Sequence, residues 1–341
     1  MDNYQRDTIT YYDNNCKKYE TEKHVLDDNF RELYHPFLER IIEGGKILDF
    51  GCGTGRDAKY FMENGYQVDA LDGSREMCKI ASDNIGKKVI HKNFLDFKVV
   101  DTYDGIWASA SLLHLSTDDL LKVLKKLAKA LKNNGYLYVS FKVGEFEGIR
   151  NSRYFNDMTE EKLKNLLTKV EEFELVDVYY NESTLVKQIN KNWINFILKK
   201  KEMVKVLSLK EPFATLIKNK IKFVETRSWK TNYRGELYIH ASITKSTLGH
   251  KNEDFMELVK DLSLSPGKII CKCKLVDCIY MTDKYIEDMK KNHYQEYICG
   301  RYEVGRYAWV LDDIEVLKEG MPAKGKLGIW SYFTGDKKRQ D

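Results

Sequence analysis

Short apolar segments alternate with helical segments along the first half of the chain. Strand-like runs include KILDF, QVDALD, DGIWASAS and YLYVSF, and helical patterns such as RDAKYFMEN and DDLLKVLKKLAKALKN separate them. This alternation is typical of a doubly wound, Rossmann-like α/β sheet. Gly135 is expected to end the helix that covers Leu120 to Leu131. FELVDVYYNES and NWINFILKK predict an antiparallel hairpin at the C-terminal edge of this sheet.

Short strands dominate the second half, with one helical pattern near 252–262. The strands are KFVETRSW, GELYIHAS, KIICKCKLVD and RYAWVLDDI, and glycines and charged turns separate them. Such a pattern predicts a small β-barrel or a β-rich domain. The charged run from Lys199 to Glu202 separates the halves. We therefore expect one domain at 1–200, a second at 203–335 and a tail at 336–341.

Length and composition fit this division. A chain of 341 residues exceeds the usual size of one hydrophobic core, and 43% hydrophobic with 32% charged residues is typical of globular domains. No signal-peptide pattern and no run of about 18 apolar residues is present, so we expect a cytoplasmic protein without a membrane partner. The seven cysteines are expected to be free thiols. Cys271, Cys273 and Cys278 lack the C-x2-C pairs of a zinc site, and no metal is expected.

Charge is distributed unevenly between the halves. Residues 1–200 hold 30 Lys and Arg against 32 Asp and Glu, whereas residues 201–341 hold 26 against 20, giving net charges of −2 and +6. A basic half can attract a polyanion such as RNA, but it can equally be a solvated surface. Charge alone does not decide between them.

A glycine-rich loop follows the first apolar strand. Gly51, Gly53 and Gly55 lie between KILDF and a helix, where the missing side chains let the backbone turn and approach a ligand. Dinucleotide-binding proteins have a related G-x-G-x-x-G at this place. The glycines alone therefore do not identify the ligand, and the surrounding residues must do so. Asp49 before the loop and Asp72 at the next strand end provide that context.

Asp72 is expected to end the second strand, and the pair Asn93–Phe94 is expected to end the third. A carboxylate at a strand end can accept hydrogen bonds from both hydroxyls of a ribose, although an aspartate in an ordinary turn is the alternative. Asn93 can supply a polar contact to an adenine and Phe94 an apolar wall. The alternative for this pair is an unexceptional strand end.

Together these residues resemble the class I S-adenosylmethionine-dependent methyltransferases over about residues 10–200. The matching pattern is Y-Y, LDFGCGTGRDA, DGS, DGIWASASLLHL and SFK-x-G-E. The resemblance implies S-adenosylmethionine as cofactor and a tyrosine-bearing N-terminal helix that covers it. The Tyr11–Tyr12 pair can equally be packing. The implied cofactor contacts are Tyr11, Tyr12, Asp49, Gly51, Gly53, Gly55, Arg56, Asp72, Gly73, Ser74, Asn93 and Phe94.

The methyl acceptor is less defined. The fourth strand ends in Ala108 to Ser111 rather than in the N/D-P-P-Y/F/W sequence of DNA amino methyltransferases, and the Pro-Cys pair of cytosine C5 enzymes is missing. His114 is a candidate general base, with helix capping or packing as the alternative. Lys142, Arg150 and Arg153 can hold an anionic acceptor or be solvated.

The second half resembles an ASCH domain, a relative of the PUA barrels that bind RNA, over about 203–333. The matching residues are L-S-L, P-x-A, K-x-x-E-x-R-S-W, Y-R-G-x-L-x-I-H-A-S and KGKLGIW. Lys222 and Arg227 are candidates for phosphate contacts, and Trp229 or Tyr233 for base stacking. Alternatively, Glu225 and Arg227 form a structural ion pair on one strand face. Some small relatives are amidohydrolases with a Lys, a Thr and a Glu, but Glu225 stands where the threonine is expected.

The two resemblances lead to one main hypothesis and two alternatives. The main hypothesis is a methyltransferase whose ASCH domain binds RNA or a nucleotide-containing ligand. The first alternative is a small-molecule methyltransferase with an anionic acceptor, whose ASCH domain binds a separate ligand. The second is a non-catalytic protein that binds S-adenosylmethionine as a signal.

Overall fold

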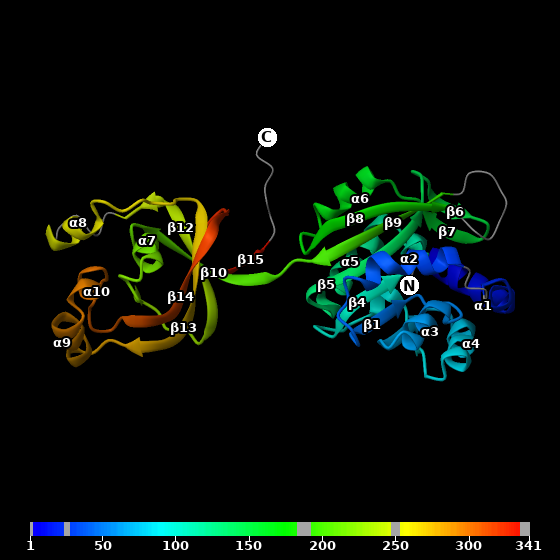
Figure 1. Cartoon of the computed structure of the whole chain (residues 1–341), viewed down its shortest axis with the longest axis horizontal. Coiled ribbons are helices and arrows are strands. Elements are labelled where there is room, and N and C mark those ends of the chain that lie inside the picture. Colours follow the sequence, from blue (N-terminus) through cyan, green and yellow to red (C-terminus); the bar gives the residue numbers. More distant parts are fainter. Residues whose placement is uncertain (1–2, 24–27, 183–191, 247–252, 335–341) are drawn as a thin grey trace. The chain divides into compact units, whose positions relative to one another are not determined.

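The structure is a computed structural model that describes residues 3–23, 28–182, 192–246 and 253–334. The chain divides into two compact units, Met1–Glu202 and Met203–Asp341, each with its own sheet (Figure 1). No helix of the described residues is long and apolar enough to cross a membrane.

The first unit is built on a seven-stranded sheet in the order β3-β2-β1-β4-β5-β9-β8. The strands from β3 to β5 run parallel, and β9 and β8 form the predicted antiparallel hairpin at the edge next to β5. The Rossmann-like α/β prediction is therefore confirmed. The bounds are β1 Lys46–Phe50, β2 Gln67–Asp72, β3 Ile90–His91, β4 Tyr103–Ala108, β5 Leu131–Lys142, β8 Phe173–Glu182 and β9 Asn192–Lys200.

Helices surround this sheet, and a short hairpin of β6 Glu147–Arg150 and β7 Arg153–Asn156 follows β5. Neighbouring residues of one strand enter different cores: Ile47 packs with the helices on one face and Leu48 with those on the other. Burial on both faces explains the continuous apolar runs of the sequence. The helices are α1 Asn3–Lys23, α2 Asp28–Leu38, α3 Arg56–Glu63, α4 Arg75–Ile85, α5 Thr117–Ala130 and α6 Glu160–Leu167, with single 3-10 turns η1 Phe94–Asp96 and η2 Leu112–His114.

Two local predictions in this unit were wrong. Gly135 does not end a helix: α5 ends at Ala130, and Gly135 lies inside β5. A Cβ at Gly135 would come within 3.0 Å of the Asp104 carbonyl oxygen, so the glycine allows a close approach of two strands. Asn93 and Phe94 do not end the third strand. They follow β3 and begin η1, where the Asn93 side chain caps the turn.

The second unit contains a six-stranded sheet in the order β11-β14-β13-β12-β10-β15. Cys271 and Cys273 point from β13 into its core, and all seven cysteines of the chain are free thiols. The β-rich prediction is confirmed. The bounds are β10 Met203–Glu211, β11 Val224–Arg227, β12 Gly235–Lys245, β13 Lys268–Tyr280, β14 Tyr307–Pro322 and β15 Ile329–Phe333.

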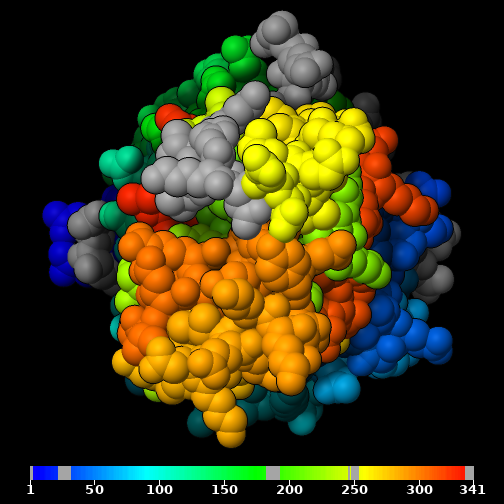
Figure 2. Space-filling model, turned by 90° about the vertical axis from the view of Figure 1, so that its left-hand side faces the viewer, coloured from blue at the N-terminus to red at the C-terminus, as the bar shows by residue number. Residues whose placement is uncertain are grey.

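The prediction of one helical segment in this unit was incomplete. Besides α8 Glu253–Val259, the structure contains α7 Phe213–Lys218, α9 Asp283–Asn292 and α10 Tyr294–Ile298. Figure 2 shows α9 and α10 (orange) beside α8 (yellow) on one face of this unit. These helices are short and lie next to strand-rich sequence. A window of about 11–18 residues, which is needed to detect the helical period of apolar residues, therefore also includes strand residues and hides that period.

Candidate active site

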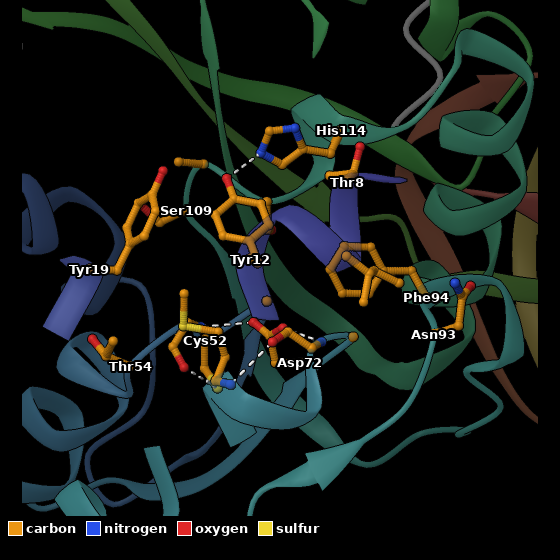
Figure 3. A pocket seen from close by; sticks show the side chains of 18 of the residues that line it. Thr8, Tyr12, Tyr19, Cys52, Thr54, Asp72, Asn93, Phe94, Ser109 and His114 are labelled. Carbon is orange, nitrogen blue, oxygen red and sulfur yellow. Dashed lines mark hydrogen bonds between the residues drawn. The ribbon is translucent and has the colours of Figure 1, made fainter. Parts of the chain in front are cut away.

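A pocket opens at the carboxyl ends of β1, β2 and β4, and residues of α1 line its other side (Figure 3). Open α/β sheets bind ligands at this place, where the strand order reverses from β1 to β4. Tyr11, Asp49 and Gly55 are not part of the described lining, and neither are Lys142 and Arg153. The predicted residues that line it are Tyr12, Gly51, Gly53, Arg56, Asp72, Gly73, Ser74, Asn93, Phe94 and His114.

The three glycines of the loop differ in the space around their Cα atoms. Gly51 has φ +87°, and a Cβ there would lie 2.3 Å from the Cβ of Ser111. Gly55 has φ +84°, and its Cβ would lie 3.1 Å from that of Ala81 in α4. Gly53 has φ +55° with no described atom within 4 Å of the added Cβ. Gly51 and Gly55 therefore allow close packing, whereas Gly53 leaves backbone open beside the pocket.

Asp72 is fixed by the loops on either side of it. One carboxylate oxygen accepts a hydrogen bond from the backbone N–H of Gly53 at 2.9 Å and the other from that of Ser74 at 2.8 Å. Burial raises the pKa of Asp72 to about 6, although these backbone donors lower it. Each oxygen keeps a further lone pair, so the carboxylate can still accept hydrogen bonds from a ligand in the pocket.

Asp49 lies under the glycine loop rather than in the pocket. It is 1% exposed, and its carboxylate accepts the backbone N–H of Ala58 in α3 at 3.1 Å. Burial, with the nearby charge of Asp57, raises its pKa well above the usual value. Asp49 therefore supports the loop from below.

Sequence reasoning missed Asp57, which organises the charges beneath the loop. Burial opposes its ionisation, but the Arg56 guanidinium and several hydrogen bonds hold its pKa below the usual value. Arg56 is thereby fixed at the pocket wall. The donors to the Asp57 carboxylate are the Tyr34 hydroxyl at 2.7 Å, the Trp107 indole at 2.8 Å and the Arg56 Nε at 2.6 Å.

Phe94 and Asn93 mark one end of the pocket, and Tyr19 and Thr54 mark the opposite end (Figure 3). The Phe94 ring lies 4.4 Å from that of Phe50, so it forms an apolar wall supported by the core. The Asn93 Oδ1 already accepts the backbone N–H of Leu95 at 2.8 Å.

Tyr12 and His114 form a hydrogen-bonded pair in the pocket. The backbone carbonyl of Tyr154 lies 2.6 Å from the His114 Nδ1, and a carbonyl only accepts, so Nδ1 carries the proton. In a neutral imidazole Nε2 is then an acceptor, and the Tyr12 hydroxyl donates to it at 2.7 Å. Burial raises the pKa of Tyr12, although the Arg153 charge lowers it, which keeps this hydroxyl protonated at neutral pH.

Arg153 is the predicted cation that lies nearest these tyrosines. Its Nη1 donates to the Tyr19 hydroxyl at 2.8 Å and the Tyr12 hydroxyl at 3.4 Å, and its guanidinium lies 4.4 Å from the centre of the Tyr11 ring. Its Nε is buried without a hydrogen-bond partner among the described residues.

The other two predicted cations are engaged at the β6–β7 hairpin. Arg150 donates two hydrogen bonds to the Asp157 carboxylate at 3.1 and 2.8 Å. The Lys142 Nζ lies 4.6 Å from the centre of the Phe155 ring.

The middle and the N-terminal end of α1 are attached to the domain by side chains that sequence reasoning missed. One Asp13 oxygen accepts hydrogen bonds from the Ser74 Oγ at 2.5 Å and the Glu76 backbone N–H at 3.1 Å, at the start of α4. Near the N-terminal end of α1, Tyr4 and Gln5 donate to Asp119 at the start of α5. These carboxylates follow no motif spacing, so only the fold reveals them.

In the second unit, Lys222 lies inside the protein. It is 1% exposed, and its ammonium donates to the Val224 carbonyl and to Glu296 at 3.4 Å. The Glu296 carboxylate also accepts from the Tyr302 hydroxyl at 2.9 Å and the Val224 N–H at 3.1 Å. In this conformation Lys222 is therefore part of a buried hydrogen-bonded cluster, which the sequence did not predict. A phosphate contact would require the side chain to leave the cluster.

The other candidates lie nearer the surface of this unit. Glu225 and Arg227 form the ion pair foreseen on one strand face, with 3.2 Å between Oε1 and Nε. Trp229 is 42% exposed and packs edge-on against Trp309, 4.6 Å between ring centres. Arg227 is partly exposed and its guanidinium lies 5.9 Å from the Trp309 ring, whereas the Tyr233 hydroxyl donates to the Glu236 carbonyl.

Comparisons with known proteins agree with this division. Residues 47–135 match the family model of a methyltransferase domain, and residues 207–318 match that of the ASCH domain. The first unit therefore contains an S-adenosylmethionine-dependent methyltransferase domain and the second an ASCH domain, as the sequence predicted.

Individual relatives match the methyltransferase part. An uncharacterized methyltransferase of Alkaliphilus oremlandii is 27% identical over 179 residues, covering 48% of this chain and 82% of the relative. One of Staphylococcus carnosus is 22% identical over 197 residues, covering 53% and 94%. Among solved structures, 1,6-didemethyltoxoflavin-N1-methyltransferase of Burkholderia thailandensis, with bound 1,6-didemethyltoxoflavin and S-adenosylhomocysteine, is 20% identical with a TM-score of 0.47 and covers 58% and 87%.

Proposed function

We propose that this enzyme methylates RNA or another nucleotide-containing acceptor, with S-adenosylmethionine in the pocket beneath α1 and the acceptor bound in part by the ASCH domain. The observation that carries the proposal is the placement of Asp72, the glycine loop and the Tyr12–His114 pair around one pocket. This arrangement supplies a site for the methyl donor next to a group that can accept a proton.

The pocket residues fit the cofactor. Asp72 has lone pairs for ribose hydroxyls, Phe94 provides an apolar wall for the base, and Gly53 leaves its backbone accessible. The Gln5 Oε1, buried in the lining, has no hydrogen-bond partner among the described residues and is available to a donor group. When bound, S-adenosylmethionine supplies a methyl group on a sulfonium, which needs a positioned nucleophile and no metal.

Tyr12 and His114 can remove the proton that the acceptor loses. The Tyr12 oxygen accepts the proton of the acceptor's O–H or N–H group while its own proton passes to the His114 Nε2. The resulting imidazolium keeps its Nδ1–H bonded to the Tyr154 carbonyl. His114 is thus the base of this proposal, and Tyr12 connects it to the acceptor.

Arg153 supports an acceptor with an anionic group. Its guanidinium lies against Tyr12 and Tyr19, and its Nε has no partner among the described residues. A phosphate of RNA and a carboxylate of a small molecule satisfy this cation equally well. This observation keeps a small-molecule acceptor as the second candidate.

The ASCH domain supports a nucleotide-containing ligand. Trp229 is exposed beside Arg227, and the unit carries the basic excess of the chain. An exposed aromatic ring next to a cation is a common way to bind a single-stranded base and its phosphate.

Incubation of the full chain with methyl-labelled S-adenosylmethionine and either total RNA or a metabolite extract tests the proposal. We expect ribonuclease-sensitive label in RNA, lost in Asp72→Ala and reduced in Trp229→Ala. Label only in the metabolite fraction would replace RNA by a small molecule as acceptor. If the protein binds S-adenosylhomocysteine but neither fraction is labelled, the protein would be a non-catalytic binding protein.

A further inference from the structure

The side-chain amide of Gln5 has a fixed orientation. Gln5 is 4% exposed, and its Nε2 donates to the Asp119 carboxylate at 2.7 Å and to the Tyr4 hydroxyl at 3.2 Å. An ionised carboxylate only accepts hydrogen bonds, so the nitrogen of the amide, and not its oxygen, must face Asp119. Although burial opposes ionisation, hydrogen bonds from Lys122 and Tyr4 hold the pKa of Asp119 below its usual value.

The Gln5 oxygen is consequently directed away from Asp119. Gln5 belongs to the pocket lining, and its Oε1 is buried without a hydrogen-bond partner among the described residues. Buried polar atoms rarely lack a partner, because the lost hydration costs free energy. A ligand that brings an N–H or O–H group to this oxygen removes that cost.

Helix spacing places Gln5 at the Phe94 end of the pocket. Tyr19, Tyr12, Thr8 and Gln5 follow one another along the face of α1 that lines the cavity, at helical spacings of seven, four and three residues. Figure 3 shows Tyr19 toward the Thr54 end and Thr8 toward the Phe94 end. Gln5 lies about one turn beyond Thr8, away from Tyr12. The base of the cofactor is expected at this same end.

We infer that the Gln5 Oε1 accepts a hydrogen bond from the exocyclic amino group of the adenine, so that Gln5 selects an amino-substituted purine base. The inference rests on the proposed cofactor. Asn93, the other side-chain carbonyl at this end, already accepts the Leu95 N–H. A base with an oxygen in place of the amino group would set two acceptors against each other, and the buried Gln5 oxygen would stay without a hydrogen bond.

Isothermal titration calorimetry of the full chain with S-adenosylhomocysteine and with S-inosylhomocysteine, its 6-oxo analogue, measures this selection. We expect the wild-type protein to bind S-adenosylhomocysteine at least about tenfold more tightly, in line with one buried hydrogen bond. In Gln5→Leu the affinity for S-adenosylhomocysteine falls and the ratio of the two affinities approaches one.

Tyr4→Phe is the matched control. It removes the hydroxyl that donates to Asp119 and accepts the longer hydrogen bond from Gln5, and so weakens the attachment of α1, but it keeps the Asp119 carboxylate that orients the Gln5 amide. We expect both affinities to fall by the same factor with the ratio retained. The ratio therefore separates recognition of the base from a general loosening of α1.

The outcomes distinguish this inference from the proposed function. If the wild-type protein does not bind S-adenosylhomocysteine, the proposed cofactor is wrong. If it binds but shows no preference, or if Gln5→Leu retains the preference, the cofactor stands and the role of Gln5 is refuted.

Discussion

The Gln5 side-chain oxygen in the methyltransferase unit and the Glu296 carboxylate in the ASCH unit are both buried, but they differ in their hydrogen bonds. In the methyltransferase unit, the Gln5 oxygen and Asp72 face a pocket, and the oxygen has no described hydrogen-bond partner. In the ASCH unit, the Glu296 carboxylate accepts bonds from the Lys222 ammonium, the Tyr302 hydroxyl and two backbone N–H groups. The first arrangement leaves room for a ligand, and the second is filled by the protein itself.

The difference shows why residue type alone does not identify a site. Lys222 and Asp72 both stand in motif-like sequence; Lys222 is buried, whereas Asp72 is partly exposed and lines the pocket. What separates them is the space beside the charged atoms: a cavity next to Asp72 and protein groups around the Lys222 ammonium. Substitutions in the two units therefore have different expected effects: loss of stability at Lys222 and loss of ligand affinity at Asp72.

Lys222→Met should destabilise the ASCH unit most strongly. It leaves Glu296 buried without its cation, which costs about 3–5 kcal/mol for a broken buried pair. Hydrogen exchange measured by mass spectrometry over a urea series reports the free energy of unfolding of this unit. Lys230→Ala, at an exposed position of the same segment, should change little. Equal effects would mean that the Lys222 cluster is not a stabilising element.

Gly51→Ala should damage the glycine loop and its packing, whereas Gly65→Ala should have a smaller effect. Both glycines have nearly the same φ, +87° and +86°, but only the Cβ at Gly51 meets another atom, the Ser111 Cβ at 2.3 Å. The extra overpacking costs about 1–3 kcal/mol. Thermal unfolding and calorimetric binding of S-adenosylhomocysteine check both variants. Normal binding by Gly51→Ala would show that the loop does not require this close approach.

Trp229→Ala should weaken RNA binding without affecting the pocket. Loss of one stacked base costs about 1–3 kcal/mol of binding free energy. Fluorescence anisotropy with a labelled single-stranded RNA measures it, and binding of S-adenosylhomocysteine should be unchanged. Tyr294→Ala, also exposed in this unit, serves as the control for loss of an aromatic side chain. If Trp229→Ala binds RNA with unchanged affinity, the proposed stacking of a base on Trp229 is wrong.

Cofactor affinity should rise with pH between 5 and 7. Because the pKa of Asp72 is about 6, its carboxylate is largely protonated at pH 5, and the affinity falls by about tenfold from pH 7 if only the ionised form binds. Calorimetry across this range measures the change, and Asp72→Asn should flatten it. An equally steep profile in Asp72→Asn would assign the titration to another group.

Folding stability should have the opposite pH dependence at this residue. The folded pKa of about 6 lies above the ordinary carboxyl pKa of 3.8. The stability that Asp72 contributes is therefore fully present below pH 3.8 and is lost as the pH rises through 6. Ionised Asp72 favours ligand binding in the same pH window in which it costs stability.

The sequence was sufficient to predict the sheet of the first unit and the pocket residues that lie at the ends of its strands. Strand and helix periods predicted the order of elements, and the glycine loop and Asp72 follow directly from the ends of β1 and β2. Gly135 was misinterpreted because a glycine after a helix signals a cap, whereas here it permits a close strand approach. Local spacing cannot distinguish these two uses.

Long-range contacts account for what the sequence did not reveal. Asp57 gains its role from Tyr34 and Trp107, and Gln5 gains its orientation from Asp119, all distant in sequence. Lys222 lies in the K-x-x-E-x-R motif, where a lysine could contact phosphate. In the structure its ammonium instead donates to Glu296 of α10. That helix was not predicted, so its effect on Lys222 could not be foreseen.

The Asp13 carboxylate couples two elements that are far apart in the sequence. It accepts from Ser74 and from the Glu76 N–H, so docking of α1 also completes the N-terminal cap of α4. Ser74 and Asp72 belong to the same turn, and both line the pocket. By thermodynamic linkage, a ligand that orders this turn raises the equilibrium constant for docking of α1 by the same factor by which docking raises the ligand's affinity. Positive cooperativity between helix closure and cofactor loading is therefore built into one side chain.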